Sequence, residues 1–187
     1  MRFYVNPLST SLILLTVVLL AGCKQQALDY GFVIKDVSVI RGYQSLNIGL
    51  QQDLAFSEQA VEALHHGVTL TVRLELELRN DNNMIVVRRE TKRFHIRYLP
   101  LSERYQLTEE GSGKLQVYSR LRHVLAEIDD LNVQLPTGPL PSGNYELRTR
   151  SSLDERLLPA PMQLPALFSP QWRHDSEWSV WPFKVSV

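Results

Sequence analysis

The sequence predicts a mainly β fold: an antiparallel, immunoglobulin-like β-sandwich of about seven or eight strands with two short helices. Residues 68–79 alternate strictly between apolar and polar side chains, which is typical of a strand with one face in the core. Other short apolar or β-branched segments recur between turn-forming residues, without a repeating strand-helix-strand order. A β-barrel is the alternative architecture.

The domain is predicted to begin with a hairpin and a helix. Residues 33–40 and 45–50 form the two strands, because the intervening segment 41–44 contains a glycine suited to a turn. In the helix that follows, we expect Ser57 to be the N-cap and Gly67 to take the left-handed position after the last turn.

A long hairpin follows this helix. The strand at 68–79 is predicted to pair with residues 84–99, because residues 80–83 are all Asn or Asp, which favour turns. The alternation lapses between Val87 and Arg93, so we expect a β-bulge or a projecting hairpin tip there.

The second half of the chain continues with short strands. They are predicted at residues 104–108, 114–118, 131–135 and 145–150. Ser119 is the expected N-cap of the second helix, which has apolar residues at helical spacing as far as Ile128. The proline-rich segment 157–169 is predicted to be extended or to form one short helical turn.

The N-terminus has the features of a secretory signal peptide. One charge, Arg2, precedes an apolar stretch that is shorter than the roughly 20 residues of a membrane-spanning helix. The stretch ends in Leu-Ala-Gly-Cys, which resembles the bacterial lipobox. We therefore expect cleavage between Gly22 and Cys23 and a diacylglyceryl group on the thiol of Cys23. The alternative is a plain cleaved signal peptide with an incidental cysteine.

These features divide the chain into a lipoprotein signal peptide (1–22), a lipidated N-terminus with a short tether (23–31) and one β-sandwich domain (32–187). The tether reaches at most about 30 Å, so the domain is expected to stay near its membrane. Lys24 replaces the aspartate that retains enterobacterial lipoproteins at the inner membrane, and this resemblance favours the outer membrane, with the domain facing the periplasm.

Residues 60–72, 93–105 and 172–182 resemble, in the same order, an uncharacterised family of exported proteins of Gram-negative bacteria, domain of unknown function 4390. The closing Trp-Ser-Val-Trp-Pro at 178–182 is the most distinctive part. The resemblance covers nearly the whole mature chain and implies an exported, β-rich domain. It implies no activity, cofactor or catalytic residue.

The composition and the motifs argue against nucleic-acid binding, metal binding and catalysis. The 20 basic and 20 acidic residues give a formal net charge of zero, which leaves no positive field for nucleic acid. His65 and His66 are adjacent and His95, His123 and His174 are isolated, unlike the spacing of metal ligands. No Gly-x-Ser-x-Gly motif is present. We therefore predict no catalytic residue, metal or cofactor.

Two groups of side chains are candidates for an interaction surface. The basic group consists of Arg88, Arg89, Lys92, Arg93 and Arg97. It suits lipid headgroups or an acidic partner, or else it pairs with Glu75 and Glu77 on the preceding strand. The aromatic group consists of Trp172, Trp178 and Trp181. It suits a sugar-stacking platform or a protein contact, or else a final strand that closes the sandwich, with tryptophans covering the end of the core.

Taken together, the sequence predicts a non-catalytic, membrane-anchored envelope lipoprotein that binds or scaffolds a membrane-proximal protein. The alternative is a binder of envelope glycan or lipid, which requires exposed tryptophans around a concave surface. A hydrolase is the third hypothesis, and it requires a pocket that gathers a histidine and a carboxylate from distant strands.

Overall fold

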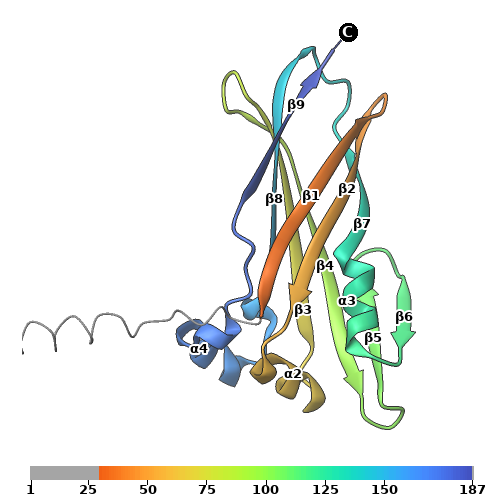
Figure 1. The fold of residues 1–187 in the computed structure, drawn as a ribbon, viewed down its shortest axis with the longest axis vertical. Coiled ribbons are helices and arrows are strands. Elements are labelled where there is room, and N and C mark those ends of the chain that lie inside the picture. Colours follow the sequence, from red (N-terminus) through yellow and green to blue (C-terminus); the bar gives the residue numbers. More distant parts are fainter. Residues whose placement is uncertain (1–29, 187) are drawn as a thin grey trace, which may run out of the picture.

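The computed structural model describes residues 30–186, and the expected signal peptide and Cys23 lie outside this range. The described chain is mainly β and forms two antiparallel sheets that pack as a β-sandwich (Figure 1). The predicted fold class is confirmed. The described residues form nine strands and three α-helices, slightly more of each than the sequence predicts.

The smaller sheet has three strands in the order β1-β2-β7. They are β1 (Gly31–Arg41), β2 (Ser45–Ala55) and β7 (Asp130–Pro136). The strands β1 and β2 form the predicted hairpin, in which β1 is irregular between Ile34 and Asp36. Apolar residues of β2 alternate into the core, so this sheet buries one face.

The larger sheet has six strands in the order β6-β5-β4-β3-β8-β9. They are β3 (Leu70–Asn80), β4 (Val86–Leu99), β5 (Arg104–Glu109), β6 (Leu115–Tyr118), β8 (Gly143–Leu153) and β9 (Ser179–Val185). Leu78 lies opposite Arg88 whereas Arg79 lies opposite Val86, so Val87 is the extra residue of a β-bulge. The predicted bulge is therefore confirmed at this end of the hairpin.

One hydrophobic core joins the two sheets and the helices. Its fully buried members include Leu46, Leu50, Leu74, Leu76, Leu78, Ile96, Val124, Ile128, Leu135 and Leu147. Tyr145 is also buried and donates a hydrogen bond from its hydroxyl to the carbonyl of Pro141 at 3.0 Å. The polar tip of this aromatic residue is thus satisfied inside the core.

The first two helices differ in how they begin. Helix α2 (Glu58–His65) has Ser57 as its N-cap, whose hydroxyl accepts from the backbone N–H of Ala60 at 3.2 Å, and Gly67 follows with a φ of 89°. Both predictions are confirmed. Helix α3 (Leu121–Asp129) begins after Arg120 without a side-chain cap, so the prediction of Ser119 as N-cap is wrong.

The segment after β8 is more helical than predicted. It contains a short 3₁₀ helix η1 (Glu155–Leu157), the α-helix α4 (Ala160–Phe168) and a second 3₁₀ helix η2 (Pro170–Trp172). Pro161 lies in the first turn of α4, where backbone N–H groups have no intrahelical acceptor. The N–H that proline lacks therefore costs the helix no hydrogen bond. Pro165 removes one hydrogen bond from inside α4.

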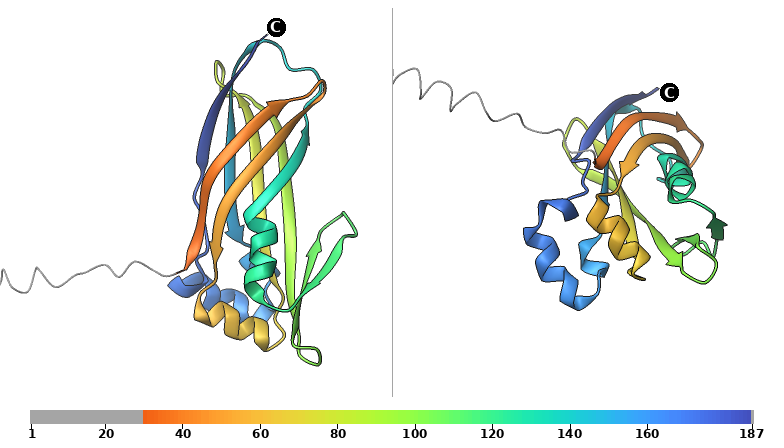
Figure 2. Two further views of the ribbon diagram at one scale, coloured as in Figure 1. Left: turned by 45° about the vertical axis from the view of Figure 1, so that its right-hand side comes forward. Right: turned by 60° about the horizontal axis from the view of Figure 1, so that its bottom comes forward.

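Helices α2 and α4 lie at the end of the sandwich where β1 begins, and the C-terminal end of β9 lies at the opposite end (Figures 1 and 2). We call the end that carries α2, α4 and the start of β1 the base. Among residues 30–186, no helix is long and apolar enough to cross a membrane.

Candidate functional site

The outer face of the larger sheet carries a network of charged side chains. Alternation along β3 directs Leu74 and Leu76 into the core, and this places Arg73, Glu75 and Glu77 on the opposite face. The register brings cationic residues from both neighbouring strands beside the acidic ones. Arg93 lies opposite Arg73, Arg150 opposite Glu75, and Arg89 and Arg148 opposite Glu77.

Glu77 is the centre of the part of the network farther from the base. Its buried carboxylate accepts hydrogen bonds from Nε of Arg79 and Nε of Arg89, each at 2.5 Å, and lies 3.7 Å from Arg148. Burial acts to raise the pKa of Glu77, but the hydrogen bonds from Arg89 and Arg79 outweigh it and hold the pKa below its ordinary value. The carboxylate of Glu77 is therefore charged, and each of its two oxygens accepts a hydrogen bond from an arginine.

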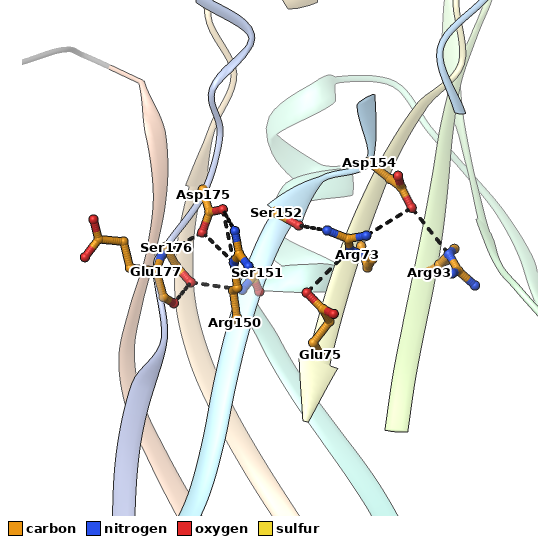
Figure 3. A network of polar contacts seen from close by, with 10 residues as sticks. All are labelled: Arg73, Glu75, Arg93, Arg150, Ser151, Ser152, Asp154, Asp175, Ser176 and Glu177. Carbon is orange, nitrogen blue, oxygen red and sulfur yellow. Dashed lines mark hydrogen bonds and ion pairs between the residues drawn. The ribbon is translucent and has the colours of Figure 1, made fainter. Parts of the chain in front are cut away.

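Nearer the base, Asp154 joins two arginines from neighbouring strands (Figure 3). Its buried carboxylate lies 3.7 Å from the guanidinium of Arg73 and 3.5 Å from that of Arg93. Arg73 also donates a hydrogen bond to the hydroxyl of Ser152 at 3.2 Å. Arg93 pairs in addition with Glu110 at 2.9 Å, and this hydrogen bond raises the pKa of Arg93.

Arg150 forms the third part of the network (Figure 3). Its Nε lies 2.9 and 3.0 Å from the two carboxylate oxygens of Asp175, and its NH2 donates to the same carboxylate. Burial acts to raise the pKa of Asp175, but the hydrogen bond from Arg150 outweighs it and lowers the pKa. The ring of Trp178 lies 5.0 Å from the guanidinium of Arg148 and 5.9 Å from that of Arg150, within cation–π range.

A hollow of about 310 Å³ opens between this network and α4. It is lined by residues of the network and by Glu155, Arg156, Gln163, Leu167 and Arg173. Arg156 and Arg173 are exposed, and neither has a carboxylate within 4 Å in the part of the chain that the structure describes. The hollow therefore offers two exposed guanidinium groups without an ion pair within 4 Å among residues 30–186. Burial raises the pKa of the Glu155 carboxylate against the lowering effect of the charge of Arg173.

His174 also borders the hollow, but its ring is committed to the fold. Its Nε2 accepts a hydrogen bond from the backbone N–H of Ser57 at 2.9 Å, and its ring packs against Tyr30, Phe32 and Phe56. Burial lowers the pKa of His174 and favours the neutral ring. Since Nε2 is occupied, this nitrogen cannot accept a proton from a substrate.

Among the other described histidines only the adjacent His65 and His66 are neighbours. The Nε2 of His65 lies 2.7 Å from the hydroxyl of Tyr105, and Nδ1 of His95 lies 2.9 Å from the hydroxyl of Thr71. His66 and His123 are exposed. Within residues 30–186, no group of three or more His, Cys, Asp or Glu side chains is arranged to hold a metal ion.

The predicted basic group is divided between two faces of β4. Arg89, Arg93 and Arg97 lie on the outer face, whereas Arg88 and Lys92 lie on the face that carries Phe94 and Ile96. Several of them are paired with acids: Arg88 with Glu90 at 3.6 Å, Lys92 with Glu109 at 3.0 Å and Arg89 with Glu77. The structure therefore does not gather them into one cationic surface.

The predicted aromatic group is divided as well. Trp172 is buried in η2 and belongs to the core. Trp181 lies opposite Leu147, on the core side of β9, and its Nε1 donates to the hydroxyl of Thr149 at 3.1 Å. Trp178 lies over the outer face instead. The three rings do not form one stacking surface.

Sequence reasoning missed the residues that build the hollow. Arg150 lies at a polar position of a predicted strand, so the alternation predicts its place on the outer face. The pattern does not identify its ion-pair partner. Asp154, Asp175, Arg156 and Arg173 come from irregular or 3₁₀ segments, whose side-chain directions follow no period.

The family model of a domain of unknown function, DUF4390, matches residues 29–182. Neither the curated proteins nor the solved structures contain a match to the chain.

Proposed function

Since this chain belongs to the DUF4390 family, whose function is unknown, we propose a function from its own features: a lipid-anchored module of the bacterial envelope that binds a membrane-proximal protein without catalysing a reaction. The lipobox-like sequence ending at Cys23 and the short tether after it support the anchor. Lys24 favours the outer membrane, with the domain facing the periplasm.

The observation that carries the binding role is the free edge of β6. This strand pairs with β5 only, and the β5–β6 hairpin stands away from the body of the sandwich (Figure 2). Leu115 and Val117 alternate on one side of it and are 56% and 43% exposed. An edge strand with exposed aliphatic residues is suited to pairing with an extended segment of a partner.

The other three edge strands are less suited to such pairing. Strand β7 exposes the polar side chains Asp130, Asn132 and Gln134 instead of aliphatic ones. Strand β9 contains Pro182, which lacks a backbone donor. Strand β1 is irregular between Ile34 and Asp36, and the exposed Lys35 lies between them. We therefore assign the partner to β6: an extended segment with alternating apolar side chains. Because β6 is only four residues long, the two aliphatic side chains must supply much of the affinity.

The polar chemistry of the hollow favours binding over catalysis. Two of its three carboxylates, Asp154 and Asp175, are held in ion pairs, and Nε2 of His174 accepts a backbone hydrogen bond. Among the residues that the structure describes, the hollow therefore has no free histidine–carboxylate pair to serve as a base, and its third carboxylate, Glu155, lies in the field of Arg173. Binding of glycan by the tryptophans receives no support, because Trp172 is buried and Trp181 lies on the core side.

The test is site-specific photocrosslinking in cells, with a photoreactive residue in place of Val117. We expect one discrete protein adduct, a reduced yield when Leu115→Asp is added, and loss of the adduct in Cys23→Ala. A photoreactive residue at Tyr43, which is 87% exposed in the β1–β2 turn, is the matched control and should give no adduct.

Each unexpected result contradicts a different part of the proposal. No adduct from Val117, or the same adduct from Tyr43, contradicts the assignment to β6. An adduct that persists in Cys23→Ala contradicts a partner that depends on the membrane anchor. Crosslinked proteins are identified by mass spectrometry.

A further inference from the structure

Helix α4 presents large apolar side chains to solvent. Leu164 is 68% exposed and Phe168 82%, and Leu167 and Leu157 are at least half exposed. Within α4 only Ala166 is buried. These three residues of α4, Leu164, Leu167 and Phe168, form what we call the apolar face of α4. They contribute little to the core, so the fold does not explain why they are apolar.

The sequence around this face is unusual for an exposed segment. Residues 157–172 contain no charged side chain, although charged residues make up 21% of the chain. The protein thus carries an uncharged segment on one side of its base, with Leu158, Ala166 and Trp172 buried and most of its other residues exposed (Figure 2). Contiguous exposed apolar side chains of this kind mark a surface that contacts another apolar phase.

Two cationic side chains flank the apolar face. Arg156 precedes α4 in η1 and Arg173 follows η2, and both line the hollow together with Leu167 of α4. Neither has a carboxylate within 4 Å among the described residues, whereas Arg73 and Arg150 beside them are paired. A guanidinium group presents several donors that match the oxygens of a phosphate. Exposed leucine and phenylalanine next to free arginines fit the boundary between acyl chains and phosphate headgroups.

The position of α4 in the molecule agrees with this chemistry. Strand β1 begins at Gly31 in the base, and Tyr30 contacts the ring of His174, one residue from Arg173. Seven residues separate Cys23 from Gly31, so the base can lie no more than about 30 Å from an anchored Cys23. We propose that the apolar face of α4, with Arg156 and Arg173, lies on a membrane surface that contains anionic phospholipid. The proposal rests on the lipid anchor of the proposed function.

The physical role of this contact is orientation. A helix of nine residues is too short to span a bilayer, so α4 lies parallel to the membrane with its apolar face among the upper acyl carbons. Acyl chains on Cys23 hold the protein at the membrane, and α4 fixes which end of the sandwich faces it. The β1–β2 turn with Tyr43 then points away from the lipid.

The chain offers a direct test, because Cys23 is its single cysteine and is consumed by acylation. The mature lipoprotein carrying Leu164→Cys is labelled with an environment-sensitive fluorophore and reconstituted into vesicles. We expect a blue shift of the emission and quenching by brominated lipids in vesicles of phosphatidylcholine with phosphatidylglycerol. The matched control, Tyr43→Cys, should show neither effect. In Arg156→Glu/Arg173→Glu, the blue shift at position 164 should fall to less than half.

The remaining outcomes separate the proposal from its alternatives. The same shift in vesicles of phosphatidylcholine alone overturns the assignment to anionic lipid. A shift that appears without vesicles and grows with protein concentration overturns it in favour of a second copy covering α4. The mass of the N-terminal peptide reports acylation independently. An acylated Cys23 without a shift at 164 overturns the proposal while the anchor stands. If the N-terminal peptide carries no acyl group, the label is placed in Leu164→Cys/Cys23→Ser, where only position 164 can react, and a shift with added vesicles then supports the α4 contact while the anchor fails.

Discussion

Asp129 ends α3 in a partly buried position, and its carboxylate accepts the backbone N–H of Leu54 at 3.1 Å. Burial raises its pKa to about 6, against the lowering effect of that hydrogen bond and with a further contribution from the charge of Asp53. The folded state therefore binds this proton more tightly than the unfolded state. The stabilisation is fully present below about pH 4 and is lost as the pH rises through about 6.

Replacement Asp129→Asn should therefore stabilise the protein at neutral pH. The amide keeps an acceptor for Leu54 and removes the desolvated charge. We expect a gain of about 1–2 kcal/mol in the free energy of unfolding at pH 7.5, discounted for partial solvation, and little change at pH 4. Urea denaturation at several pH values measures it. Asp36→Asn, at an exposed position of β1, is the control, with an expected change below about 0.5 kcal/mol. A parallel pH dependence in both variants would contradict the prediction.

Residue-level expectations from sequence succeed where the physical cause is local. Ser57 and Gly67 are recognised because capping depends on neighbouring residues of the same helix. The burial of His174 cannot be predicted in this way, because its ring packs against Phe32 and Phe56, which are far away in the sequence. Asp129 is missed for the same reason, because its partner Leu54 lies on β2.

At the scale of an element, α2 and α3 provide a matched pair of capping tests. Replacement Ser57→Ala removes the acceptor for Ala60 and also the donor to the carbonyl of Gln171 at 2.7 Å. We expect a loss of about 1–2 kcal/mol in the free energy of unfolding. Ser119→Ala removes no cap and should change it by less than about 0.5 kcal/mol. Chemical denaturation compares the two, and equal losses would contradict the assigned caps.

The contribution of the ion pairs on the outer face of the larger sheet to stability can also be tested. Replacement Glu77→Gln leaves Arg79, Arg89 and Arg148 close together without their shared carboxylate. We expect a loss of about 1–3 kcal/mol, because the buried hydrogen bonds weaken and the three cations repel one another. Added salt should recover part of the loss by screening.

Glu90 provides the control for this prediction. It pairs with Arg88 at 3.6 Å in a more exposed position on the other face of β4. Glu90→Gln should cost less than about 0.5 kcal/mol. Thermal unfolding at low and high salt measures both variants. A Glu77→Gln variant as stable as Glu90→Gln would show that the network does not stabilise the sheet.

At this scale, the sequence predicts the elements whose side chains repeat with a regular period. Strand β3 is found from sequence because alternation has a period of two and one of its faces is buried. Helix α4 is not, because prolines at 159, 161 and 165 indicate extended chain and its apolar residues face solvent instead of the core. The hollow beside it depends on η1, η2 and the loop before β9, which have no repeating pattern.

At the scale of the whole molecule, the sequence predicts one domain, and the shared core makes that expectation testable. Leu50 belongs to the smaller sheet and Leu76 to the larger one, and both are buried in the same cluster. Trp172 packs into this cluster from the base. Because each sheet covers the other, neither keeps its apolar face buried alone. Unfolding should therefore be a single cooperative transition.

Replacements Leu50→Ala and Leu76→Ala should each lower the free energy of unfolding by about 2–5 kcal/mol, since each leaves a cavity in the core. In both variants the transition followed by tryptophan fluorescence should coincide with that followed by far-ultraviolet circular dichroism. Leu164→Ala on the exposed face of α4 is the control and should leave the midpoint nearly unchanged. In Trp178→Phe/Trp181→Phe, fluorescence reports on Trp172 alone; if it changed before the dichroism of the sheets, the base would unfold separately. The rigid connection between α4 and the sandwich, which lets a membrane contact orient the whole molecule, would then be lost.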